Sequence, residues 1–179
     1  KLVNEGIVMA GHDVSAGGLI TTLLEMCFAN TTGGMEINLD SVVEDDIVKL
    51  LFAENPALVI QVADKDKCRM QAILDDAGIC FVKIGTPCAK RHIAVAKNRR
   101  TRLFDIDHYR DVWFDSSYLM DLKQSFNGCA SERLKNYKNQ PLRYRLPSNF
   151  TGMLQNYGMS ADRREKSGVR AAIIREKGT

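Results

Sequence analysis

The stretch Ile7–Ala29, IVMAGHDVSAGGLITTLLEMCFA, holds the strongest structural signals in the chain. It opens with a short apolar run at residues 7–10, which lies between glycines and is typical of a buried strand. Apolar residues then recur at positions 19/20, 23/24 and 27/28, and this spacing predicts an amphipathic helix of about three turns. The residues between the two elements are therefore expected to form a turn that connects a strand to a helix.

Similar patterns on the C-terminal side of this stretch predict a small sheet with a second helix. Further strands are expected at residues 35–39, 58–62, 79–84, 92–96 and 99–104, the last at an edge. Asp64 or Asp66 is expected to cap the second helix, which has an apolar stripe around Ile73 and a stop at Gly78. The order β-α-β-β-α-β-β favours an α+β fold, a mixed sheet with helices packed on it.

The character of the chain changes after residue 104. Asp115 is expected to cap a helix that ends near residue 124, with Phe114 and Leu119 as its hydrophobic staple. Trp113 and Phe114 are expected to anchor this helix to the sheet domain. Residues 127–165 are polar and broken, which predicts a linker, and the apolar run at 169–174 predicts a strand that begins a further domain.

Charge also divides the chain, at about residue 130. Residues 1–130 carry 14 Lys and Arg against 18 Asp and Glu, a net of −4, whereas residues 131–179 carry 11 against 4, a net of +7. Because the basic part contains no nucleic-acid recognition motif, a solvated linker is favoured over nucleic-acid binding. The five scattered cysteines without CxxC spacing, and the absence of an apolar run of membrane-spanning length, indicate a reduced cytoplasmic protein without membrane contact.

The turn at residues 11–18 carries the groups of a phosphate or Mg-nucleotide site. Asp13 is a hard oxygen ligand that suits Mg²⁺, and Ser15 can donate a hydrogen bond to a phosphate oxygen. Gly17 and Gly18 allow close approach of a phosphate to the helix N-terminus. The spacing is neither a Walker A loop nor GxGxxG. The spacing alone favours an ordinary strand–turn–helix junction, in which Asp13 or Ser15 caps the helix.

Two neighbouring residues have similar alternatives. His12 can contact a phosphate or act as a general acid, but a hydrogen bond to its own loop backbone is the favoured role. Glu54 precedes a strong strand and is a candidate second-shell or metal-bridging carboxylate, although a salt bridge within its loop is favoured.

Several motifs resemble the large single-chain phosphoribosylformylglycinamidine synthase family, the purine-pathway amidotransferases. They occur in the family's order along the chain: HDVSAGGL (12–19), LLEMCFANTTGGMEINL (23–39), LFAENPALVIQV (51–62), RRT (99–101), VWFDSSYLM (112–120), NGCASE (127–132) and VRAAIIREKG (169–178). The resemblance implies an AIR-synthase-like C-terminal domain of the second synthetase repeat at 1–104, a helix and linker at 105–165, and the start of a class I glutaminase domain at 166–179.

The resemblance also implies an activity and a ligand set. The family converts formylglycinamide ribonucleotide, glutamine and ATP into the amidine, glutamate, ADP and phosphate. By analogy Asp13 would bind Mg²⁺ and Ser15 the adenine nucleotide, which is structural in the second repeat of the large enzymes. The remaining synthetase domains and the glutaminase domain would be its partners. The glutaminase catalytic residues would lie outside the chain, so this segment is expected to be inactive alone.

Two other readings stay open. Another enzyme of the AIR-synthase superfamily, such as selenophosphate synthetase, would share the motif but lack a glutaminase strand at 169–178. A non-catalytic scaffold domain would use the motif only to shape a loop. The sequence does not decide the source organism, the oligomeric state, or whether the nucleotide site is catalytic.

Overall fold

A computed structural model describes residues 1–139 and 145–159. The chain divides into two compact units, Lys1–Leu142 and Arg143–Thr179. The described part of the second unit contains a short 3-10 turn at Leu154–Tyr157. The ring of Tyr157 in this turn lies 5.8 Å from the ring of Phe150, which precedes the turn. The strand predicted at residues 169–174 lies outside the described residues, and the predicted boundaries at 104 and 165 remain predictions.

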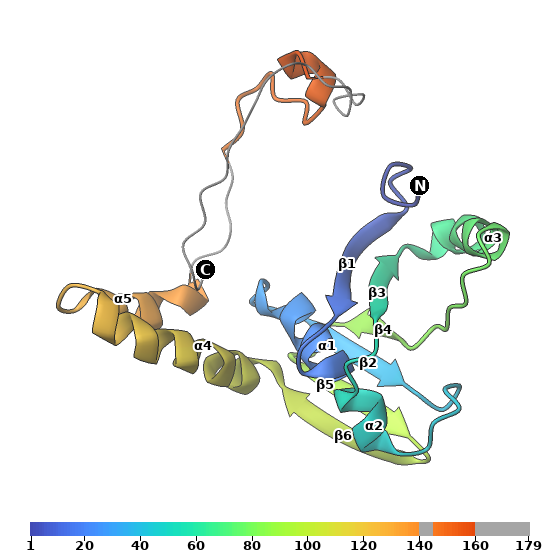
Figure 1. Cartoon of the computed structure of the whole chain (residues 1–179), viewed down its shortest axis with the longest axis horizontal. Coiled ribbons are helices and arrows are strands. Elements are labelled where there is room, and N and C mark those ends of the chain that lie inside the picture. The colour runs from blue at the N-terminus through green and yellow to red at the C-terminus, as the bar shows by residue number, and fades with distance from the viewer. Residues whose placement is uncertain (140–144, 160–179) are drawn as a thin grey trace. The chain divides into compact units, whose positions relative to one another are not determined.

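The first unit has an α+β fold, as the sequence predicted (Figure 1). Its elements are β1 Val8–Val14, α1 Gly18–Phe28, β2 Gly34–Asn38, α2 Ile47–Phe52, β3 Ala57–Val62, α3 Lys67–Asp76, β4 Gly85–Cys88, β5 His92–Lys97, β6 Arg100–Asp105, α4 Ile106–Gln124 and α5 Cys129–Asn136. Strands β1 and β3 form an antiparallel two-stranded ribbon, and a separate sheet has the order β4-β2-β5-β6. The larger sheet is mixed, because β2 and β5 are parallel and the other pairs are antiparallel.

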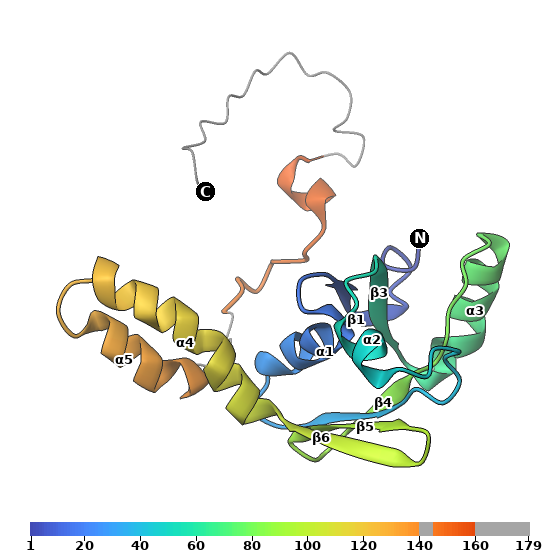
Figure 2. The same ribbon diagram turned by 60° about the horizontal axis from the view of Figure 1, so that its bottom comes forward.

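Helix α1 supplies much of the core. In Figure 2, α1 and the β1–β3 ribbon lie on the same side of the four-stranded sheet. The helix buries its apolar stripe against side chains that alternate along β2 and β5, as a two-residue strand period requires. The buried cluster also includes the first residue of α4, and its members are Ile20, Leu23, Leu24, Cys27, Ile37, Leu39, Leu51, Ile93, Val95 and Ile106.

The turn between β5 and β6 has two residues, Asn98 and Arg99, and both have positive φ, at 51° and 60°. Two central residues in the left-handed region define a type I′ turn, whose twist matches that of the flanking strands. The predicted edge strand at 99–104 is therefore β6, the second half of a tight hairpin.

The strand predicted at residues 79–84 is wrong. These residues form an irregular connection, and the strand begins at Gly85 instead. Most of the apolar residues in the connection face solvent, with Ile79 53% and Val82 49% exposed. Gly85 lies so close to β2 that a Cβ atom would be 2.3 Å from the carbonyl oxygen of Glu36. Pairing with β2 therefore occurs where the chain has its smallest residue, not where it is most apolar.

The predicted N-cap at Asp115 is also wrong. The N-cap of α4 lies ten residues earlier, at Asp105, whose carboxylate accepts a hydrogen bond from the backbone N–H of His108 at 2.8 Å. Phe114 does not form a staple with Leu119 at a helix start. Its ring stacks on the ring of Tyr137, in the 3-10 turn that follows α5, with centroids 4.1 Å apart.

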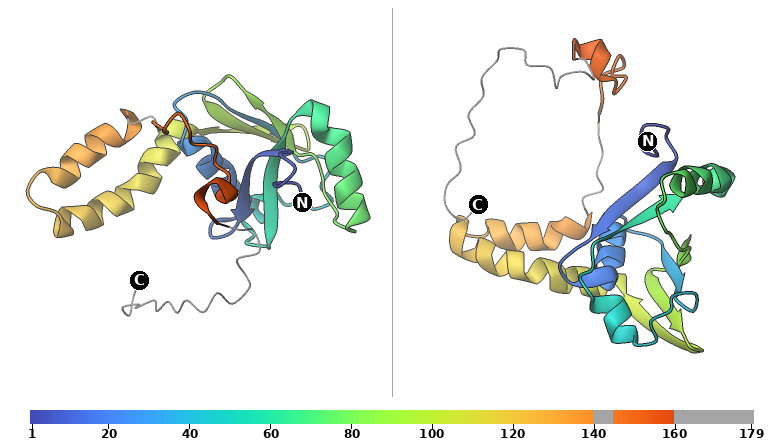
Figure 3. Two further views of the ribbon diagram at one scale, coloured as in Figure 1. Left: turned by 90° about the horizontal axis from the view of Figure 1, so that it is seen from above. Right: turned by 45° about the vertical axis from the view of Figure 1, so that its right-hand side comes forward.

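Two helices were not predicted. Asp46 caps the short helix α2 by accepting from the N–H of Val48 at 2.9 Å. Helix α5 lies within the segment predicted to be a linker, and it pairs with α4 in a helical hairpin that extends away from the sheet (Figure 3). Arg133 of α5 holds the hairpin to Asp121 and Ser125 at the end of α4.

Candidate functional site

The HDVS motif lies at the end of β1 rather than in a turn. Strand β1 continues to Val14, so His12 and Asp13 belong to the strand, and Asp13 stands opposite Leu58 of β3. The predicted turn is accordingly shorter, and Gly17 is the N-cap of α1 instead of Asp13 or Ser15. The side chain of Asp13 is 68% exposed, and Ser15 is exposed. The structure therefore brings the predicted metal ligand and hydroxyl to one accessible strand end.

The two glycines have a structural explanation. Gly17 and Gly18 have φ values of 85° and 71°, in the left-handed region that side chains rarely adopt. A Cβ atom on Gly18 would lie 2.7 Å from the carbonyl oxygen of Leu51 and 2.8 Å from Cα of Phe52. The N–H of Gly18 donates to the carbonyl of Ser15 at 3.0 Å. Backbone geometry and close packing on α2 thus require glycine here without any phosphate.

Glu54 contacts the same turn from the loop after α2. Its Oε1 accepts a hydrogen bond from the backbone N–H of Gly17 at 2.9 Å. An anion at this position is favoured by the dipole of α1. Among the described residues Glu54 makes this backbone contact in place of the loop salt bridge favoured from the sequence, and its candidate role as a second-shell or metal-bridging carboxylate stays a prediction. It ties together two segments that are 37 residues apart.

His12 connects the strand end to two helices. Its Nδ1 lies 2.8 Å from the carbonyl oxygen of Asp13, the loop-backbone contact favoured from the sequence. Its Nε2 lies 3.4 Å from Oε2 of Glu25 in α1. The other carboxylate oxygen of Glu25 accepts from Nε1–H of Trp113 at 3.1 Å. Trp113 also lies against Phe28, with ring centroids 5.5 Å apart, so it anchors α4 to the sheet domain through α1, as the sequence predicted.

Thr22 is a further polar residue of this region that sequence reasoning missed. Its side chain is buried in α1, at 2% exposure, and its hydroxyl lies 3.0 Å from the carbonyl oxygen of Asp13. The only signal in the sequence was a hydroxyl residue on the apolar face of the helix, which has no defined meaning without the fold.

The described residues form no preassembled metal centre, since none of their His, Cys, Asp and Glu side chains gather in groups of three or more that could hold an ion. Asp13 would contribute a single carboxylate to any shared site. Among the helices that the structure describes, none is both long and apolar enough to cross a membrane.

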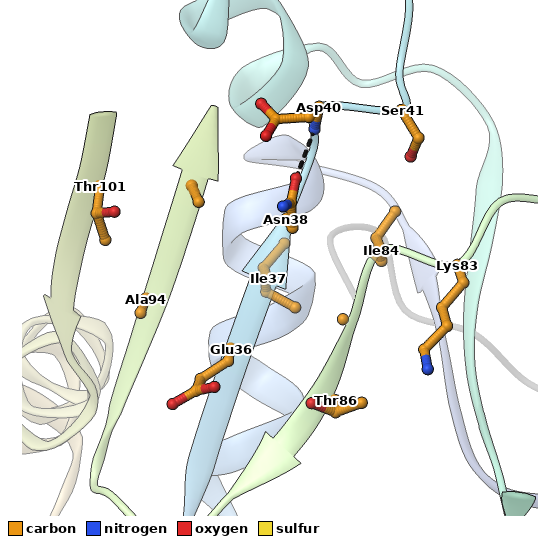
Figure 4. A pocket seen from close by; sticks show the side chains of 12 residues that line it. Glu36, Ile37, Asn38, Asp40, Ser41, Lys83, Ile84, Thr86, Ala94 and Thr101 are labelled. Atoms are coloured by element: carbon orange, nitrogen blue, oxygen red, sulfur yellow. Dashed lines mark hydrogen bonds between the residues drawn. The ribbon is translucent and has the colours of Figure 1, made fainter. Parts of the chain in front are cut away.

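A hollow of ≈ 630 Å³ lies elsewhere, on the four-stranded sheet (Figure 4). Glu36, Asn38, Ala94 and Ala96 line it, and they alternate with the core residues of β2 and β5, so it lies on the face opposite α1. The strand residues that line the hollow have largely small side chains. The amide oxygen of Asn38 already accepts a hydrogen bond from the backbone N–H of Asp40 at 2.7 Å. It contains none of the predicted site residues, and its size alone indicates no chemistry. We therefore place the candidate site at the end of β1.

Comparison with known proteins gives consistent similarities. Human phosphoribosylformylglycinamidine synthase is 31% identical over 99% of this chain, and its Schizosaccharomyces pombe counterpart is also 31% identical over 99%. The chain spans 13% and 14% of these relatives. The solved structure of T. maritima PurL complexed with ATP superposes on 59% of this chain and 19% of its own, with a TM-score of 0.53 at 17% identity, which shows a common fold.

The family comparison covers the part of the chain that contains the candidate site. The family described as AIR synthase related protein, C-terminal domain, matches residues 1–98. These residues include all of β1 to β5 and every predicted site residue. Since they are more than half of the chain, the chain belongs to the AIR synthase related family and carries its C-terminal domain.

Proposed function

We propose that this chain is a segment of an ATP-dependent carbon–nitrogen ligase that makes formylglycinamidine ribonucleotide in purine biosynthesis. In this proposal the full-length enzyme uses glutamine as the amide donor and acts in the cytoplasm. The observation that carries it is the 31% identity to human phosphoribosylformylglycinamidine synthase over 99% of the chain. A relative of common fold was solved in complex with ATP, which supports a nucleotide as ligand of the family.

We further propose that Asp13 and Ser15 contribute to a Mg-nucleotide site in that enzyme. Asp13 would act as a ligand of Mg²⁺, which prefers carboxylate oxygens, and Ser15 would donate a hydrogen bond to the nucleotide. Both side chains are exposed at the same strand end. Gly17 and Gly18 would shape the turn that presents Ser15. The metal would neutralise phosphate charge, and these residues would hold and orient the nucleotide.

The test is the amount of adenine nucleotide that the purified full-length enzyme retains. Asp13→Asn keeps the shape but removes the charge that a hard cation needs, so retention should fall strongly. Ser15→Ala removes one hydroxyl hydrogen bond, worth roughly 0.5–1.5 kcal/mol net, and should weaken retention less. Asp64→Asn is the matched control, since Asp64 is exposed in the turn before α3.

A structural nucleotide and a catalytic one give different results. If the nucleotide is structural, both variants should lower the melting temperature clearly. The catalytic rate per folded molecule should then change less. Unchanged nucleotide content in Asp13→Asn contradicts the metal assignment. It would favour the scaffold alternative, which has support in the turn-shaping roles of Gly18 and Glu54.

A further inference from the structure

We propose that Thr22, His12 and Glu25 are positioning residues that hold the backbone of Asp13 in place for cation binding. This inference rests on the proposed function of Asp13. It concerns residues that would not themselves contact the nucleotide or the metal. The basis is a chain of hydrogen bonds and close contacts that converges on a single backbone atom, the carbonyl oxygen of Asp13.

Two side chains reach that oxygen from different elements. The Thr22 hydroxyl lies 3.0 Å from it and His12 Nδ1 lies 2.8 Å from it. A carbonyl oxygen only accepts, so both groups donate, and together they can use its two lone pairs. The Thr22 hydroxyl has one hydrogen and also lies 3.3 Å from the carbonyl of Gly18. The shorter distance to Asp13 favours the bond between elements over the bond within the helix.

Burial makes the Thr22 contact costly to lose. Thr22 is 2% exposed, so water cannot easily replace its hydroxyl if the bond is broken. A buried polar group without a partner is unfavourable. The hydroxyl therefore fixes the end of β1 against the first turns of α1.

Glu25 holds the second donor. Nδ1 gives its hydrogen to the carbonyl of Asp13, so the opposite ring nitrogen attracts the Glu25 carboxylate, 3.4 Å away, in the imidazolium form, in which both nitrogens carry hydrogen. That carboxylate is held in turn by the indole N–H of Trp113 at 3.1 Å. In the imidazolium form the ring is oriented at both ends, and its position depends on α1 and α4.

The result is a free side chain on a fixed backbone. The Asp13 side chain is 68% exposed, and His12 Nδ1 lies 3.5 Å from its carboxylate. A ligand whose backbone is fixed by surrounding hydrogen bonds loses less freedom when it binds a cation. The supporting residues should therefore change the Mg²⁺ requirement of the site as well as its stability.

Neighbouring threonines of α1 provide a matched test in the full-length enzyme. Thr22→Val keeps the shape and removes the donor, whereas Thr22→Ser keeps the hydroxyl. Thr21→Val removes a hydroxyl that donates within the helix, to the carbonyl of Gly17 at 3.1 Å. The measurement is the Mg²⁺ concentration at half-maximal retention of adenine nucleotide, with the melting temperature recorded for each variant.

We expect Thr22→Val to raise that Mg²⁺ concentration about fivefold, the effect of one net hydrogen bond. Thr22→Ser should restore it, and Thr21→Val should leave it unchanged even where the melting temperature falls. Glu25→Ala, near the surface, should raise it as well, and this variant tests the inference if Thr22→Val does not fold.

The outcomes separate this inference from the proposed function. If Asp13→Asn alters the Mg²⁺ requirement while Thr22→Val and Glu25→Ala do not, only the positioning role is overturned. Equal shifts in Thr21→Val and Thr22→Val also overturn it, because they indicate general destabilisation. If Asp13→Asn has no effect, the metal assignment fails and the positioning inference fails with it.

Discussion

Gly18 lies where a left-handed backbone meets the backbone of a distant segment. Its φ is 71°, and an added Cβ would be within 2.7 Å of Leu51 O. Gly78, at the end of α3, has a φ of 65° but open space around the position of a Cβ. Substituting alanine at Gly78 therefore measures the free-energy cost of the strained dihedral alone. The same substitution at Gly18 adds the cost of a steric clash.

We expect Gly18→Ala to destabilise the fold far more than Gly78→Ala. The strained dihedral alone costs about 1 kcal/mol at Gly78, whereas the clash at Gly18 should bring the loss to about 3 kcal/mol or more. Urea unfolding of the two variants measures the difference. Similar losses at both positions would show that α2 moves to make room and that the close packing is not rigid.

The Tyr137 hydroxyl gives a pH-dependent prediction. Burial, aided by its hydrogen bond to the Asp111 carboxylate, raises the pKa of Tyr137 from 10.0 to about 12. Between these values the folded chain keeps a proton that the unfolded chain has lost. The stabilisation is therefore complete below pH 10 and should disappear as the pH rises toward 12.

Phenolate absorbance against pH checks the Tyr137 prediction. Tyr137→Phe should remove the absorbance step near pH 12 and keep the ring stack on Phe114. Asp111→Asn should lower the pKa of Tyr137 but leave it above the ordinary value, because burial persists. A titration of Tyr137 near its ordinary pKa of 10.0 would contradict the packing of the α4–α5 hairpin.

Among the elements, the β5–β6 hairpin contains a residue that is poorly suited to its turn. Arg99 has a φ of 60°, a conformation that favours glycine and that asparagine tolerates better than arginine. We expect Arg99→Gly to stabilise the chain by about 1 kcal/mol. Asn98→Gly is the control and should change stability less. Denaturant midpoints for both variants test this, and a loss of stability in Arg99→Gly would mean that the Arg99 side chain makes a favourable contact.

Local sequence patterns predicted those elements that contain enough apolar residues of their own to mark a buried face. The first helix and the strand at 92–96 follow their periodicity, and the apolar run at 58–62 lies in β3. Helix α4 was placed too late because its buried first turns contain Arg110, which is 7% exposed and reads as a surface residue. Helix α5 buries only Ala130, and most of its residues are polar, so it offers few apolar positions from which a helix could be predicted.

The candidate site divides in the same way. Asp13, Ser15 and His12 are adjacent in the sequence, so a motif could identify them. Thr22, Glu25 and Glu54 reach the strand end through contacts that depend on how α1, α2 and α4 pack. Such contacts between elements have no fixed spacing, and only the folded arrangement reveals them.

In the molecule as a whole, the five cysteines are free and differ in accessibility. Cys68, Cys80 and Cys129 are exposed, whereas Cys27 is buried in the core. Burial raises the pKa of the Cys27 thiol, with a smaller opposing effect of Arg91. Burial therefore lowers both the fraction of reactive thiolate and the access of a reagent to it.

A thiol reagent should therefore react quickly with the three exposed cysteines and slowly with Cys27. In urea all the thiols should react at similar rates. Cys27→Ala should remove the slowest phase and leave the fast phase unchanged. Fast reaction of Cys27 in the native chain would indicate that the sheet opens readily at α1.

The parallel pairing of β2 with β5 sets the order in which this unit can be completed during synthesis. Met35 stands opposite Ile93, and the buried Lys97 ammonium donates to the carbonyl of Leu39, 58 residues earlier. At about 5–20 residues per second a ribosome needs about 3–12 s to make that interval. The apolar faces of α1 and β2 remain uncovered for that time, whereas the β5–β6 hairpin closes within about 1–10 μs once it emerges. The nascent chain thus has a defined period in which a chaperone can bind its exposed apolar surface.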